Sequence, residues 1–66
     1  MKNAKSQLNE AFSQLQNAQL NLKNALETVE QQNNKRAIQT TLSAVDEAVF
    51  TAANAVANYQ DTNYKD

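Results

Sequence analysis

A seven-residue repeat runs through most of this 66-residue chain, and it constrains the possible folds more than any other feature. Apolar residues recur at alternating steps of three and four in both halves of the chain. The first series is Leu8, Ala11, Leu15, Ala18, Leu22, Ala25 and Val29, and the second is Ile38, Leu42, Val45, Val49, Ala52, Val56 and Tyr59. An average spacing of 3.5 residues is typical of α-helices that pack along one side, as in coiled coils. The sequence therefore predicts two amphipathic helices.

The polar segment EQQNNKR separates the two series. Asparagine tolerates the left-handed conformation that often ends a helix, so we expect Asn33 to follow the first helix and Asn34 to cap the second. The predicted boundaries are a first helix over about 4–32, a turn at about 33–34, a second helix over about 35–60 and a frayed tail over 61–66. So short a turn makes the helices antiparallel. The predicted fold class is all-α, with one helical-hairpin domain over residues 1–66.

Folding the chain between Asn33 and Asn34 pairs residues whose numbers add to 67. Under this rule every residue of the first series faces one of the second, for example Leu8 with Tyr59 and Ala18 with Val49. In four of the seven pairs an alanine faces a larger residue, which lets two helices approach closely. The pattern predicts a helix–helix seam formed by both series, resembling the layers of a coiled coil.

A chain of this length buries only about 60% of its unfolded surface and is marginally stable alone. It contains no cysteine and no histidine, so disulfides and zinc clusters of the usual Cys/His type are excluded. Self-association is the remaining way to stabilise so small a domain. We therefore expect a homodimer of hairpins that forms a four-helix bundle.

The candidate self-association residues flank the two seam series. The second helix carries small residues at heptad spacing beside its seam, and larger apolar residues widen both helices, so each helix is apolar or small over a wide arc. The predicted set is Ala37, Thr41, Ala44, Ala48, Thr51, Ala55, Phe12, Leu26 and Phe50. Leu20 stands apart from this set, at the outermost heptad position among polar neighbours, and is a candidate contact for an unidentified protein partner.

The charge and hydropathy pattern excludes several classes of protein. Six Lys/Arg and seven Asp/Glu give a net charge of -1, whereas a nucleic-acid-binding domain usually has a basic stripe. The chain has no run approaching the roughly 20 apolar residues of a membrane span, and no apolar segment follows Lys2 and Lys5 as in a signal peptide. We expect no membrane span and a cytoplasmic location.

No pattern of catalytic or metal-binding residues is present in the sequence. There is no glycine for a phosphate-binding loop and no histidine for a nucleophile–base pair or a di-iron bundle site. Asp46 and Glu47 diverge by about 100° on a helix, so they do not face one cleft as a glycosidase pair must. We expect a protein that is not an enzyme and has no cofactor.

The size, the central turn and the alternating large and small layers resemble the Rop family of RNA-binding adaptors, which are homodimeric four-helix bundles. This resemblance covers the whole chain and implies the same fold. RNA binding would also require a basic outer face on the first helix. That face is nearly neutral here, because Glu10 and Glu27 offset Lys23.

The run SQLQNAQLNLKNAL, the short polar turn, the second helix rich in Gln and Ala, and the ending Tyr64-Lys65 are similar to a second family. Its members are proteins of unknown function, about 65 residues long, from endospore-forming Firmicutes. The resemblance implies a small spore-associated protein in the spore interior that is not an enzyme, and it transfers no functional residues.

The sequence leaves three functions open. The favoured one is a self-associating helical module for protein interaction or structure. The alternatives are a small RNA-binding adaptor on a Rop-like bundle, and a regulator or inhibitor that docks a helix into a groove of a protein partner.

Overall fold

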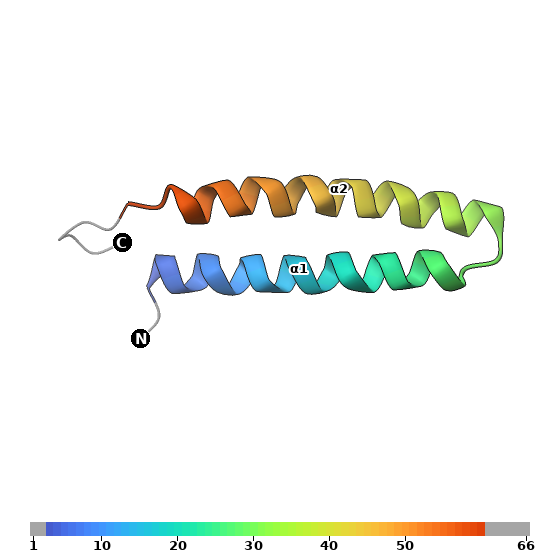
Figure 1. Ribbon diagram of the computed structural model, residues 1–66, viewed down its shortest axis with the longest axis horizontal. Coiled ribbons are helices and arrows are strands. Elements are labelled where there is room, and N and C mark those ends of the chain that lie inside the picture. The colour runs from blue at the N-terminus through green and yellow to red at the C-terminus, as the bar shows by residue number, and fades with distance from the viewer. Residues whose placement is uncertain (1–2, 61–66) are drawn as a thin grey trace.

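The computed structural model is an antiparallel hairpin of two α-helices, and it describes residues 3–60 (Figure 1). Helix α1 covers Ala4–Thr28 and helix α2 covers Gln32–Ala57. The two helices lie side by side over their whole length, and both ends of the described chain lie at the same end of the hairpin. The predicted all-α helical hairpin is confirmed.

Helix α1 begins with a side-chain cap. Asn3 has an extended backbone, and its Oδ1 accepts a hydrogen bond of 2.9 Å from the backbone N–H of Ser6. The Asn3 carbonyl oxygen accepts the N–H of Gln7 at 3.0 Å. Because the first N–H groups of a helix have no partner within it, this cap fixes the start of α1.

The turn lies earlier than the sequence predicted. Residues 29–31 connect the helices, whereas the prediction placed the turn at 33–34 and extended the first helix to 32. Asn33 and Asn34 lie inside the first turn of α2, and no described residue has a positive φ angle. The predicted left-handed Asn33 and the predicted cap at Asn34 are therefore wrong.

Helix α1 ends at Thr28 and Val29, two residues for which the sequence predicted no capping role. The Thr28 hydroxyl donates to the carbonyl oxygens of Ala25, at 3.2 Å, and Asn24, at 3.4 Å. Val29, a β-branched residue, is extended at φ -71° and ψ 141°, and its N–H still reaches the Ala25 oxygen at 2.9 Å. The Thr28 hydroxyl and the Val29 N–H thus share the Ala25 carbonyl oxygen, and the extended backbone of Val29 ends the helix without a left-handed residue.

Helix α2 starts and ends with amide side chains. Gln31 is its N-cap and makes no side-chain bond to the backbone, although its Oε1 accepts the Asn34 Nδ2 at 3.3 Å. At the other end, both the N–H and the Nδ2 of Asn58 donate to the Asn54 oxygen at 2.9 Å. The expected frayed tail over 61–66, including Tyr64, lies outside the described residues.

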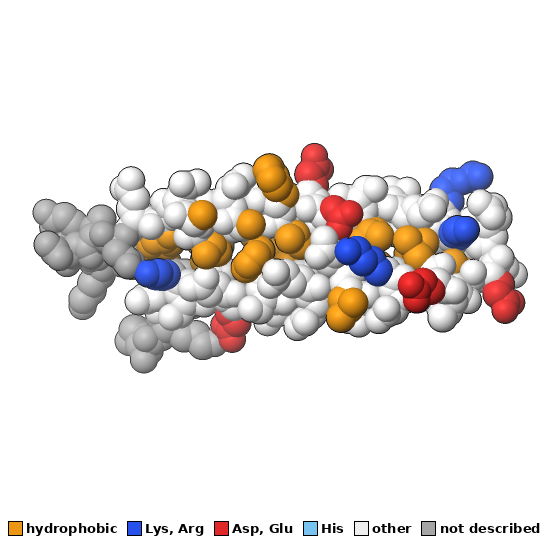
Figure 2. Space-filling view, viewed as in Figure 1, with side chains coloured by type: hydrophobic (Ala, Val, Ile, Leu, Met, Phe, Trp, Pro, Cys, Tyr) orange, Lys and Arg blue, Asp and Glu red, His pale blue; other side chains and the backbone are white. Residues whose placement is uncertain are grey.

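Half-buried apolar side chains form a seam between the helices, and Figure 2 shows them in a line along the hairpin. All seven residues of the second predicted series are half-buried, in agreement with the prediction; Tyr59, the last of them, lies just beyond α2. In α1 the prediction fails at Ala11, which is exposed, while its neighbour Phe12 is half-buried. Burying a phenyl ring removes far more apolar area from water than burying a methyl group, so Phe12 takes the seam position.

A hydrogen bond across the seam reports the register. Gln19 Nε2 donates to Asp46 Oδ1 at 2.6 Å, joining residues whose numbers add to 65. The earlier turn lowers the sum below the predicted 67, and this bond agrees with the lower value. The turn sets the register of a hairpin, so an error in its position shifts every pair.

Candidate self-association interface

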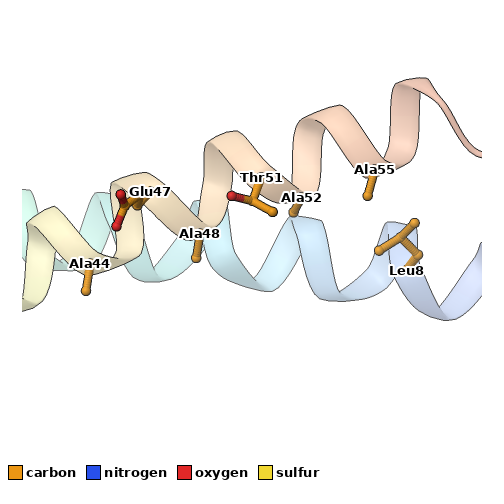
Figure 3. A pocket seen from close by; sticks show the side chains of 7 residues that line it. All are labelled: Leu8, Ala44, Glu47, Ala48, Thr51, Ala52 and Ala55. Atoms are coloured by element: carbon orange, nitrogen blue, oxygen red, sulfur yellow. The ribbon is translucent and has the colours of Figure 1, made fainter.

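An open groove runs along α2 beside the seam, on the side where Leu8 of α1 approaches (Figure 3). Its lining consists of Leu8, Ala44, Glu47, Ala48, Thr51, Ala52 and Ala55. The volume of about 570 Å³ is within the range of small-molecule pockets, but such pockets enclose most of a ligand and present several convergent polar groups. This groove is open to solvent and lined mainly by methyl groups, so its shape fits a helix better than a small molecule.

The groove collects most of the small residues that the sequence marked on the second helix. Four lining residues belong to this series, which we call the small-residue stripe: Ala37, Thr41, Ala44, Ala48, Thr51 and Ala55. Ala48 is half-buried at the seam edge, and the other five are exposed. The structure thus places the stripe on one continuous side of α2, as its seven-residue spacing requires.

The polar atoms within the stripe need no outside partner. The Thr41 hydroxyl donates to the Ala37 carbonyl oxygen at 2.9 Å, one turn back along the helix. A threonine hydroxyl bonded in this way is already satisfied. A second surface could therefore cover Thr41 without leaving its hydroxyl unpaired, which would otherwise carry a large desolvation cost.

Helix α1 contributes a row of alanines to the same side of the hairpin. The bond between Gln19 and Asp46 marks one side of the seam. Ala18 precedes Gln19 by about 100° around α1, and Ala48 lies about 200° beyond Asp46 around α2, so both point to the other side. The seven-residue spacing keeps a whole row there, which we call the alanine row: Ala4, Ala11, Ala18 and Ala25.

The stripe and the alanine row together form what we call the small-residue face. Ala11, Ala18 and Ala25 are in the predicted seam, whereas Ala4 has no predicted role. The sequence shows the seven-residue spacing of these alanines. It does not show how far they are turned from the seam, because Phe12 and Leu26 compete for the same seam positions. The structure shows both of these larger residues half-buried and Ala11 exposed. Ala18 and Ala25 are half-buried as predicted, so they lie where the seam meets the small-residue face.

The other candidates lie away from this face. Phe50 is 68% exposed, and because it follows Ala48 by two residues it points about 200° away from it. Leu20 is 58% exposed. It follows Ala18 by two residues, so it points about 200° away from the alanine row. Phe12 and Leu26 are part of the seam between the helices of one hairpin.

Charge also divides the two sides of the hairpin. Among the residues that line the groove, Glu47 alone is charged, and it lies about 100° from Ala48. The opposite side, which we call the charged face, carries Lys23, Glu27 and Asp46 together with Leu20 and Phe50. Figure 2 shows charged side chains beside the seam and hydrophobic side chains standing apart from it.

Residues 3–60 contain no group of three or more His, Cys, Asp or Glu side chains placed to hold a metal ion. Within the same residues, neither helix is long and apolar enough to span a bilayer. Searches with the sequence and the structure found no matching family model, no matching curated protein and no matching solved structure.

Proposed function

We propose that this chain is a self-associating helical module, not an enzyme, in which two hairpins pack through their small-residue faces to form a four-helix bundle. The observation that carries the proposal is that no described side chain is fully buried. A helix pair with one half-buried seam leaves much of its apolar surface in water, and burial of that surface is the main favourable term in folding. A second copy supplies the missing layer.

The hairpin is more extended than a compact monomer of the same mass. The chain exposes 5360 Å², whereas a compact monomer of 7.3 kDa is expected to expose about 4,200 Å². The radius of gyration is 15.5 Å, compared with about 11 Å for a compact domain of this length. Both values fit a subunit of a larger bundle.

The composition of the small-residue face favours packing against a second copy. Helix axes approach to about 8 Å only where the facing side chains are small. Alanine and threonine lose little side-chain entropy on burial, so most of the contact energy is retained. Both helices supply such residues on this face, over nearly their whole length.

Sedimentation equilibrium of the wild-type chain tests the proposal, with an expected mass twice the 7.3 kDa of one chain at micromolar concentration. Ala48→Glu should weaken association about a hundredfold, because two carboxylates would be buried close together, at a cost of about 3 kcal/mol. Ser43→Glu, an exposed site on the charged side of α2, is the matched control and should associate like the wild type.

Asn17→Glu provides a second control on the outward side of α1. Far-UV circular dichroism at high concentration must show that each variant is helical. A folded wild-type monomer would refute the proposal. Equal association of Ala48→Glu and Ser43→Glu would show that another surface is used.

A further inference from the structure

We infer an orientation for the second copy: α2 packs antiparallel against α2 of the other chain, with the two-fold axis near Ala48 and the two turns at opposite ends. This inference rests on the self-association proposed above. It names the helices that meet and the point about which they are related.

The spacing of the small-residue stripe is nearly symmetric about Ala48. Thr41 and Ala55 each lie seven residues from it, while Ala44 and Thr51 lie four before and three after. A two-fold interface is formed by the same surface on both subunits, so that surface must complement itself after rotation. In an antiparallel pair centred on Ala48, Thr41 meets Ala55 of the second copy and Ala44 meets Thr51. Small side chains meet small side chains at these positions, while Glu47 lies at the edge of the groove near the axis.

The alanine row of α1 has its centre at nearly the same level. Because Gln19 bonds to Asp46 in an antiparallel pair, Ala48 lies level with about residue 17 of α1. The midpoint of the alanine row lies between Ala11 and Ala18, less than one helical turn away. One axis therefore relates both helices of the hairpin to their copies, with α1 facing α1 and α2 facing α2.

The widths of the two small surfaces argue against the alternative, in which α2 faces α1 of the other chain and both turns lie at one end. The stripe on α2 is two columns wide, since Ala44 and Thr51 stand beside Thr41, Ala48 and Ala55. The row on α1 is one column wide, because Gln14 and Asn21 occupy the neighbouring column.

Packing the wide stripe against the narrow row would bury the amides of Gln14 and Asn21 against alanine and threonine. A buried amide without a hydrogen-bond partner is costly. Pairing like with like places the methyl-lined surfaces of α2 at the centre of the interface. It leaves the amides of α1 at a rim that water can reach, which is the usual anatomy of an interface.

Disulfide trapping tests this orientation cleanly, because the chain has no cysteine of its own. A disulfide requires two Cα atoms within roughly 4.4–6.8 Å. Ala48→Cys should link to its own copy at least tenfold faster under mild oxidation than Ser43→Cys, an exposed control on the charged side of α2. Thr41→Cys mixed with Ala55→Cys should give the mixed dimer, and neither should link to itself at a comparable rate.

Sedimentation equilibrium of the reduced variants separates the two proposals. If they are dimeric and Ala48→Cys links instead to Ala18→Cys, the orientation is wrong and self-association stands. If Thr41→Cys links to its own copy faster than to Ala55→Cys, the antiparallel pairing is likewise wrong. If the reduced variants and the wild type are all monomeric, both proposals fail.

Discussion

The two sides of this hairpin are built from the same two helices but differ in side-chain size and charge. The small-residue face presents alanine and threonine beside a groove, with Glu47 at its edge. The charged face presents Lys23, Glu27 and Asp46, and it also exposes Leu20 and Phe50 by more than half of their surfaces. From the size of the exposed apolar residues alone, the charged face would be chosen as the binding surface.

In the proposed association, close approach of the helices contributes more than the size of isolated apolar side chains. Single exposed leucines and phenylalanines are normal on protein surfaces. A continuous methyl-lined surface lets backbones approach and gain contact along several turns, as ridges pack into grooves. The contrast between the two faces can be tested by substitution, and charges placed on the small-residue face have the largest expected effect.

Ala18→Glu should disrupt association about as strongly as Ala48→Glu, by about 3 kcal/mol or a hundredfold in the dissociation constant. Ala18 is in the alanine row, so a two-fold interface through the small-residue face would place two new carboxylates close to each other. Gln16→Glu introduces the same charge two residues away, at an exposed site on the charged side of α1, and is the control. Sedimentation equilibrium measures both. If Gln16→Glu alone weakened the dimer, the interface would lie on the charged face and the proposed interface would be wrong.

Leu22→Ala should lower the free energy of unfolding by about 2 kcal/mol, the lower end of the range for leucine truncation because Leu22 is only half-buried. Leu22 lies in the seam shared by both faces, so folding and association should weaken together. Urea unfolding followed by circular dichroism at several protein concentrations measures both effects. A midpoint that does not depend on protein concentration would contradict coupled folding and association.

The fold was predictable from the sequence because the seven-residue repeat fixes helix type, helix number and the apolar side of α2. The turn was not, because two competing sets of capping residues stand close together. The prediction relied on the left-handed tendency of Asn33, whereas in the structure the Thr28 hydroxyl and the extended Val29 end α1 sooner. Local hydrogen bonds of this kind depend on geometry that spacing does not encode.

The side of α2 that carries the candidate interface residues was predictable from the sequence, whereas on α1 the exposure of Ala11 was not. On α2 every seam residue except Ala52 is large and the residues of the stripe are small, so the sequence shows which side of the helix faces α1. On α1 both Ala11 and Phe12 fit an alternation of three and four, and packing selected Phe12. Ala11 is therefore exposed beside the seam, whereas Ala18 and Ala25 are half-buried, in agreement with their predicted seam positions.

Glu47→Gln should tighten association two- to fivefold, while Asp46→Asn should not. In the inferred orientation Glu47 of each copy lies near the two-fold axis, so removing both charges relieves a weak repulsion of at most about 1 kcal/mol. Asp46 lies on the charged face and bonds to Gln19 of its own chain at 2.6 Å. Its replacement should instead lower hairpin stability by about 0.5 kcal/mol. Sedimentation equilibrium in low and high salt measures the first effect, which should shrink as salt increases.

Leu20→Ser and Phe50→Ser should have the smallest effects, each changing the free energy of unfolding by less than about 0.5 kcal/mol. Both side chains are already more than half exposed, so truncation removes little buried area. Association should also be unchanged, because both residues lie on the charged face. If either variant dissociated the dimer, the contrast between the faces would be reversed. If instead both remain dimeric but Leu20→Ser alone loses a protein that the wild type captures, Leu20 is the contact for a second, different partner.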